Sequence, residues 1–82
     1  MSTQLSIYQM RGIGLDLARR IRTEQGQMVV FFEACLHEEH ANAECEMYLL
    51  QDPELMCTFG IKHAEGFWIV LGMYEGTRGE NA

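Results

Sequence analysis

The stretch Gln25–Leu36, QGQMVVFFEACL, decides the fold, because the spacing of apolar residues changes within it. Before it, Ile13, Leu17 and Ile21 recur every four residues, which is the spacing of one face of a helix. From Gln27 onward, apolar residues alternate with their neighbours, which is the spacing of a strand. The sequence therefore predicts an α+β domain in which one amphipathic helix precedes and covers an antiparallel sheet.

The helix is predicted over residues 13–24, with charged residues on its outer side. Gln25-Gly26 is a suitable end, because glycine readily adopts the left-handed conformation that follows a helix. The start is less well marked, since no Ser, Thr or Asn lies directly before Ile13. Upstream, Leu5 and Ile7 alternate with Ser6, so residues 4–10 also fit a short N-terminal strand.

Four alternating segments rich in aromatic and β-branched residues predict a β-meander of about four strands. They cover residues 27–36, 44–49, 55–62 and 67–73. A helix through residues 28–50 is the competing interpretation, because the stretch Glu33–Glu44 suits a helix in composition. We prefer strands because of the Val-Val-Phe-Phe opening and the alternation after Glu44.

The connections between these segments are short and polar, as expected for a meander. Asp52-Pro53 has the residues of a turn, because proline presets the φ angle of the second turn position. Pairing Leu36 with Cys45 and Ile61 with Phe67 places apolar residues on one face throughout, and it brings Trp68 over Gly60. The connections are residues 37–43, 51–54 and 63–66.

The second face of this predicted sheet is also largely apolar, although a single helix can cover only one face. Monomers seldom expose more than a few hundred Å² of contiguous apolar surface. A homodimer or another protein is therefore expected to cover this face, and the alternative is a sheet that curls into a partial barrel. The residues expected on this face are Val29, Phe31, Tyr48, Leu50, Trp68, Val70 and Tyr74.

Length and charge restrict the kind of protein further. The 82 residues allow one domain, assigned to residues 1–76, followed by a polar, glycine-rich tail over 77–82. A net charge of −6 disfavours direct binding to nucleic acid or to an anionic membrane. The longest apolar run has five residues, whereas a membrane span needs about 20. The start has no signal peptide, and three cysteines leave one unpaired, so we expect a cytoplasmic protein with free thiols.

One cluster of metal-ligand types stands out, at Cys35, His37, His40 and Cys45. Two thiolates and two imidazoles form the ligand set of many structural zinc sites. The spacing C-x-H-x2-H-x4-C is not that of a common zinc motif, and the predicted register puts the two cysteines on opposite faces. A small zinc domain is therefore the alternative to the function proposed below, and a polar hairpin loop is the simpler interpretation.

No set of residues predicts catalysis. Cys35 is the one thiol expected to be accessible, and the sequence does not place a histidine and a carboxylate beside it. Gly12-Ile13-Gly14 lacks the third glycine and the lysine of a phosphate-binding loop. We therefore expect a protein that is not an enzyme and that needs no cofactor.

Charge is distributed unevenly along the chain. Residues 1–26 carry four bases and two acids (+4 − 2 = +2), and residues 27–82 carry two bases and ten acids (+2 − 10 = −8). An acidic surface steers encounters with a basic partner, and aromatic residues dominate interface energies. The sequence thus predicts a non-enzymatic protein-binding module or inhibitor. The expected partner-binding residues are Tyr48, Trp68, Tyr74, Glu38, Glu39, Glu44 and Glu46.

In size, charge and lack of motifs, the chain resembles small phage-encoded inhibitors, anti-CRISPR proteins among them. Proteins of this class block nucleic-acid-binding machines by occupying the surface that binds phosphates. The resemblance implies a phage-type inhibitor whose partner has a basic surface.

Overall fold

A capping box at Ser6 starts the first helix, α1 (Ile7–Gln25), six residues before the predicted start. The computed structural model describes residues 5–77 of the chain. The Ser6 hydroxyl accepts a hydrogen bond from the Gln9 backbone N–H, and the Gln9 side chain accepts one from the Ser6 N–H. The N-terminal strand predicted over residues 4–10 is therefore wrong, and Gln4 lies outside the described residues. The predicted end at Gly26, with φ 72°, is confirmed.

The first strand, β1 (Gln27–Cys35), follows Gly26 directly and confirms the predicted change from helix to strand. A register shift between Phe31 and Glu33 interrupts its alternation. Because of this bulge, Phe31 and Ala34 lie on one face, whereas Phe32 and Cys35 pack on the other.

The second helix, α2 (Glu38–Gln51), replaces both the predicted loop over 37–43 and the predicted strand over 44–49. The residues that it turns toward the sheet are Ala41, which is buried, and Cys45 and Tyr48, which are half-buried. They are four and three positions apart, as on one face of a helix. The alternation of Cys45, Met47 and Leu49 therefore does not mark a strand. The predicted strand pairing of Leu36 with Cys45 is wrong, because Cys45 lies in a helix.

Two more strands complete the described chain, β2 (Leu55–Lys62) and β3 (Trp68–Thr77). The predicted turns before and between them are confirmed: Leu55 N–H donates to the Asp52 carbonyl, and Gly66 N–H donates to the His63 carbonyl. Ile61 pairs with Ile69 and not with Phe67, a shift of two residues that keeps Cys57, Phe59 and Ile61 on one face. A register shift between Leu55 and Cys57 turns Leu55 to the other face. Of the predicted tail over 77–82, Thr77 belongs to β3, and the rest lies outside the described residues.

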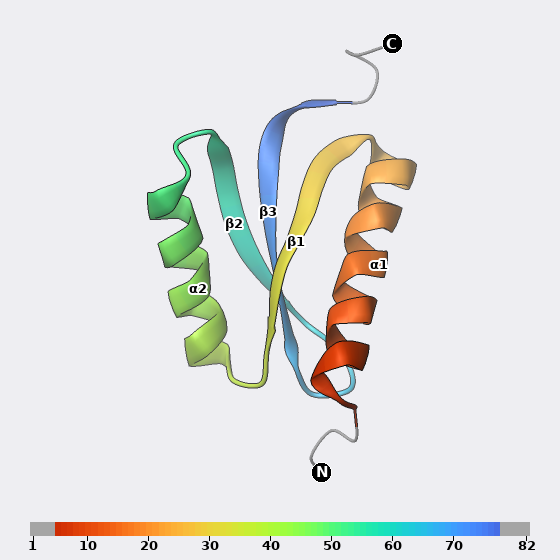
Figure 1. Cartoon of the computed structure of the whole chain (residues 1–82). Helices are drawn as coiled ribbons and strands as arrows, with labels where there is room; N and C mark the ends of the chain where they lie inside the picture. Colours follow the sequence, from red (N-terminus) through yellow and green to blue (C-terminus); the bar gives the residue numbers. More distant parts are fainter. Residues whose placement is uncertain (1–4, 78–82) are drawn as a thin grey trace.

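The strands form an open antiparallel sheet in the order β1-β3-β2, so the predicted four-stranded meander and the barrel alternative are both wrong. Strands β1 and β2 both run antiparallel to β3 and are therefore parallel to each other. Parallel strands need a long crossover, and α2 supplies it. This arrangement is a split βαβ unit preceded by α1 (Figure 1).

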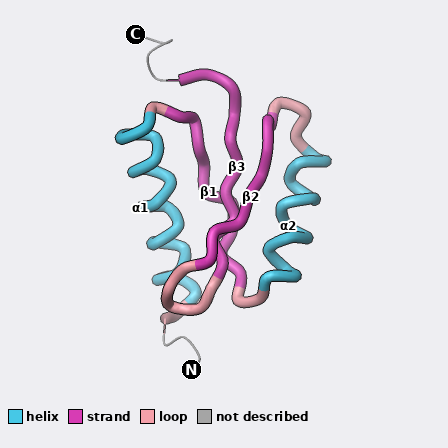
Figure 2. The backbone as a smooth tube through the Cα atoms, turned by 180° about the vertical axis from the view of Figure 1, so that it is seen from behind, coloured by secondary structure: helices cyan, strands magenta, loops and turns pink. Residues whose placement is uncertain are grey.

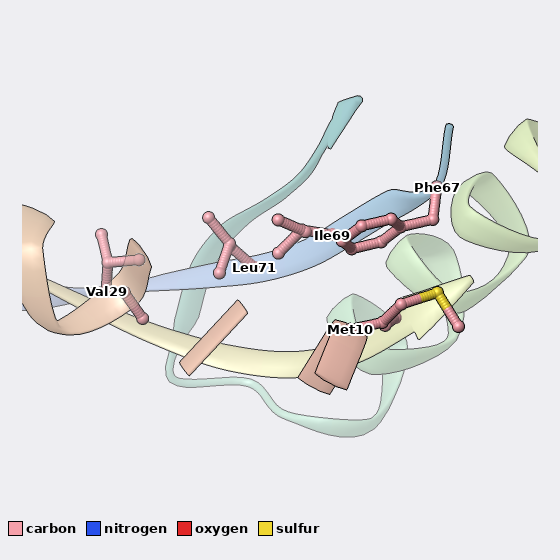
Figure 3. Packing of buried hydrophobic residues seen from close by; sticks show 7 residues of the cluster. Met10, Val29, Phe67, Ile69 and Leu71 are labelled. Carbon is pink, nitrogen blue, oxygen red and sulfur yellow. The ribbon is translucent and has the colours of Figure 1, made fainter. Parts of the chain in front are cut away.

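The two helices lie on opposite faces of the sheet, as Figure 2 shows from behind. Under α1, β3 contributes Ile69 and Leu71, and Figure 3 shows them lined up with Phe67, Met10 and Val29. Under α2, β3 contributes Val70, which packs with Cys35 and Ala41. Helix α2 thus covers the second face within the chain, with Val70 and Trp68 on that face as predicted. Val29 and Phe31, predicted on the same face, lie under α1 instead, so that prediction is wrong.

Glycines on the α2 face make room for aromatic rings. Trp68 lies against Gly60, with its Cε3 atom 3.6 Å from the position that a Cβ would occupy, which confirms the predicted contact. A Cβ on Gly72 would overlap the ring of Phe32 and the Leu55 side chain. The Phe32 ring therefore requires glycine at position 72, whereas a Cβ on Gly60 would make ordinary contact with Trp68.

Two glycines of α1 provide a matched test of this packing. Gly14 is buried against Phe31, and a Cβ there would overlap the Phe31 ring, whereas nothing lies within 4 Å of a Cβ on Gly12. We expect Gly14→Ala to destabilise the protein by about 1–3 kcal/mol through overpacking. Gly12→Ala should stabilise it by about 0.5–1 kcal/mol, because alanine favours the helix. Urea denaturation of both variants measures this, and equal effects would contradict the described packing of α1.

Candidate protein-binding surface

Helix α2 is held to the sheet by its inner side. Ala41 is buried, and the Tyr48 ring stacks on Phe32 with 4.2 Å between ring centroids and 8° between the planes. The Cys45 carbonyl accepts a hydrogen bond from the Thr58 hydroxyl at 2.9 Å, which joins α2 to β2. These contacts determine which side of α2 faces outward.

The outward side carries a stripe that we call the outer stripe, which consists of Glu39, Ala43, Glu46 and Leu50. Their spacing of four, three and four residues places them on one side of the helix, and all four are exposed. Leu50 is 86% exposed, and Met47 beside it is 39% exposed. An exposed apolar end next to a row of carboxylates is a composition suited to contact with another protein.

Acidic charge dominates α2. The helix carries four glutamates and no lysine or arginine. Glu38 and Glu39 lie in its first turn, where they interact favourably with the helix dipole. Glu38, Glu39 and Glu46 are exposed, whereas Glu44 is half-buried beside Cys35 and Tyr48 and contributes to raising the pKa of both groups. The four predicted glutamates thus share one element, which is a helix and not a hairpin.

The basic residues lie mainly on the opposite side of the molecule, on α1. Arg19 pairs with Asp16 at 2.6 Å, which lowers the pKa of that carboxyl group. Arg11 pairs with Glu33 of β1 at 3.3 Å. Since α1 and α2 lie on opposite faces of the sheet, the separation of charge along the sequence becomes a separation across the molecule.

The three aromatic residues predicted as binding anchors all have contacts within the chain. Tyr48 is stacked on Phe32, and its burial raises the pKa of the phenol. Trp68 is half-buried against Gly60. Tyr74 donates a hydrogen bond of 2.6 Å to Asp52, which raises the pKa of the tyrosine hydroxyl. These contacts leave the aromatic rings only partly available to another protein.

Met47 was not predicted as a surface residue, and Leu50 was predicted only as part of the apolar sheet face expected to be covered by a partner. The period of two placed Met47 inside a strand and Leu50 on a sheet face instead of on a helix. With the helical period, Ala41, Cys45 and Tyr48 fall on one side, and Leu50 falls opposite them. The competing interpretation, a helix through residues 28–50, would have placed Leu50 on the outer side of a helix and so would have predicted this surface.

The Cys/His cluster does not form a metal site within residues 5–77, where no three His, Cys, Asp or Glu side chains gather around a common point. Cys35 and Cys45 pack in one cluster under α2, so their predicted placement on opposite faces is wrong. His37 and His40 are exposed, with ring centroids 5.7 Å apart, and line an open hollow of about 690 Å³ at the β1 edge. The ligands proposed for the zinc alternative are thus divided between core and surface.

The three thiols are free, and Cys35 and Cys45 are poorly suited to nucleophilic attack. Cys35 is 9% exposed, and burial is the main reason that its pKa is raised, followed by the charges of Glu44 and Glu33. Burial also raises the pKa of Cys45. Because the thiolate is the reactive form, both environments lower cysteine reactivity at neutral pH.

Comparison with family models, with curated proteins and with solved structures found no match for this chain. None of the helices in the described part of the chain is long and apolar enough to cross a membrane. The surface must therefore be interpreted from its own chemistry.

The bond between Tyr74 and Asp52 can be tested with a matched pair of variants. Tyr74→Phe removes the donor and should destabilise the protein by about 0.5–1 kcal/mol, at the low end because the pair is open to solvent. Tyr8→Phe is the control, because Tyr8 is 80% exposed and should change stability by less than about 0.5 kcal/mol. The Tyr74 pKa lies above its ordinary value of 10.0, so this contribution should persist below pH 10 and disappear above the folded-state pKa. Urea denaturation across this pH range gives the free energies of unfolding.

Alkylation tests the burial of Cys35. In the folded protein, iodoacetamide should modify Cys35 most slowly of the three cysteines, because its sulfur is buried and its pKa is raised above the usual 9.0. In urea the three rates should become similar. Peptide mass spectrometry reads each site separately, and rapid modification of Cys35 in the native state would contradict its described position.

Proposed function

We propose that this protein is a non-enzymatic binding module that docks the outer stripe of α2 onto a basic surface of another protein. The observation that carries the proposal is the composition of this stripe: Leu50, 86% exposed, lies one turn after Glu46, on a helix with four glutamates and no lysine or arginine. An exposed leucine alone is ordinary. Here the leucine lies near several glutamates, on a helix that is held against the sheet by its inner side. This combination favours a rigid surface for docking.

Charge complementarity defines the chemistry of the partner. Glu39 and Glu46 would face arginine or lysine side chains, and Leu50 with Met47 would enter an apolar depression beside them, at the C-terminal end of α2. Basic surfaces of this kind occur where proteins bind the phosphates of nucleic acids. Occupying such a surface would block nucleic acid from it, so the proposal includes inhibition of a nucleic-acid-binding protein, as in the phage-encoded class that the sequence resembles.

The remaining features are compatible with this role. A rigid helix loses little conformational entropy on binding, because its inner side is already packed. The basic residues of α1 lie on the other face of the sheet, where they do not compete with the partner for the carboxylates of the outer stripe. Three free thiols suit a reducing compartment such as the cytoplasm.

Charge reversal with a matched control tests the proposal. Glu39→Lys with Glu46→Lys places two cations on the outer stripe and should weaken binding at least tenfold, or about 1.4 kcal/mol. Glu24→Lys with Glu65→Lys changes the same number of exposed acids elsewhere, and both pairs shift the net charge from −6 to −2 (−6 + 4). The control should retain affinity, apart from a uniform effect of net charge.

The partner is obtained by capture from a lysate of the natural source, and the binding constants are then measured with both proteins purified. Calorimetry should show that affinity falls as salt increases, because charges at the rim of the interface are screened. Leu50→Glu should also abolish binding. A partner that binds both double variants equally, or that binds independently of salt, would rule out the outer stripe as the docking surface.

A further inference from the structure

The two edges of the sheet are protected to different degrees. Strands β1 and β2 are both edge strands, since the order is β1-β3-β2. On β1, Arg22 donates to the carbonyl oxygen of Val29 at 2.7 Å, and the Glu33 carboxylate accepts from the Ala34 N–H at 3.1 Å. Side chains therefore occupy backbone groups of this edge, which is a common way to prevent pairing with another chain.

Strand β2 has no comparable protection in the described residues. No hydrogen bond joins a side chain of residues 5–77 to the backbone of β2. Its eight residues contain no proline, and its one charged residue, Lys62, is the last. Natural edge strands usually carry proline, a central charge, a bulge or very few residues. The one register shift of β2 on β3 lies at its start, between Leu55 and Cys57. The central part of β2, Cys57–Ile61, is thus open to pairing.

Charge marks the two ends of this open strand with opposite signs. Glu54 lies directly before β2, Lys62 ends it, and both residues are exposed. Lys62 forms no ion pair among residues 5–77. When a strand with an acid at one end and a base at the other pairs antiparallel with its own copy, each acid faces a base.

We propose that β2 pairs antiparallel with β2 of a second copy of this chain, which joins two sheets into one of six strands. In the register with Thr58 on the two-fold axis, paired residue numbers add up to 116. Cys57 of each copy then faces Phe59 of the other (57 + 59 = 116). Lys62 of each copy lies at the same end of the paired strands as Glu54 of the other, beyond the register shift between Leu55 and Cys57, within reach of its long side chain. The two Lys-Glu pairs distinguish this register from its neighbours.

Packing on both faces favours the same occupant. Cys57, Phe59 and Ile61 lie on the α1 side of the sheet but are only half-buried, because α1 packs mainly over β1. A second β2 would cover part of these side chains. On the other face of the sheet, the Cys45 carbonyl of α2 accepts a hydrogen bond from Thr58 of β2. Leu49 lies one helical turn after Cys45 and is therefore also on the side of α2 that faces β2. Leu49 is 43% exposed, and the dimer brings the two α2 helices side by side there.

This dimer is independent of the proposed partner, because it leaves the outer stripe exposed. Leu50 and Glu46 point away from the sheet and would remain accessible in both copies. A failure of the dimer would thus leave the partner-binding proposal standing, and the reverse also holds.

Charge swapping tests the register. Sedimentation equilibrium over a concentration series should show a monomer–dimer equilibrium for the natural sequence. Lys62→Glu places like charges together at both ends and should weaken the dimer at least tenfold, and Glu54→Lys should do the same. The double variant restores opposite charges and should recover the dimer.

Net charge supplies an internal control. Glu54→Lys reduces the negative net charge of each copy from −6 to −4 (−6 + 2). The weaker general repulsion between copies would by itself strengthen association, whereas the proposed pairing predicts weakening. Glu65→Lys produces the same net charge at another exposed position and should not weaken the dimer. Circular dichroism verifies that each variant is folded.

Three outcomes would overturn the proposal. The first is a natural sequence that stays monomeric at every concentration. The second is a dimer that is unaffected by both single charge changes. The third is a dimer that Leu50→Glu abolishes while the charge variants do nothing, because the copies would then meet through the outer stripe.

Discussion

Ile69, Val70 and Leu71 of β3 are buried on alternate faces of the sheet, and both helices depend on them. Ile69 and Leu71 are covered by α1, and Val70 between them is covered by α2. Each is at most 1% exposed. Because strand side chains alternate, three consecutive apolar residues serve two separate cores. The central position of β3 makes this possible, since it pairs with β1 on one side and with β2 on the other.

Most of the fold could be predicted from local sequence patterns. The alternation within Gln27–Cys35, Leu55–Lys62 and the start of Trp68–Thr77 corresponds to the three observed strands, and Gly26 ends the first helix as expected. The register of β2 on β3 was off by two residues, which apolar matching cannot detect because such a shift keeps every face. The strand order could not be predicted either, because it depends on the crossover through α2, and the residues of α2 were predicted as a loop and a strand.

The misreading of α2 explains the remaining differences. Its sequence fits two periods at once: Cys45, Met47 and Leu49 alternate, while Ala41, Cys45 and Tyr48 follow a helix. Contact with the sheet decides between them, because Tyr48 can stack on Phe32 only from a helix above it. The acidic residues of the candidate surface could be read from composition alone. The exposure of Leu50 could not, because it depends on the direction in which the helix faces.

The strand order also bears on how the chain reaches its native state. Ile61 and Ile69 pair across only eight residues (69 − 61 = 8), whereas Val29 and Met73 pair across 44 (73 − 29 = 44). Closing a longer loop costs more conformational entropy, so the hairpin of β2 and β3 is the natural nucleus and β1 joins it late. During synthesis, α1, β1 and α2 leave the ribosome before the strand that connects them exists. A chain interrupted before β3 would thus have no sheet at all, and both helices would expose their apolar sides to chaperones and proteases.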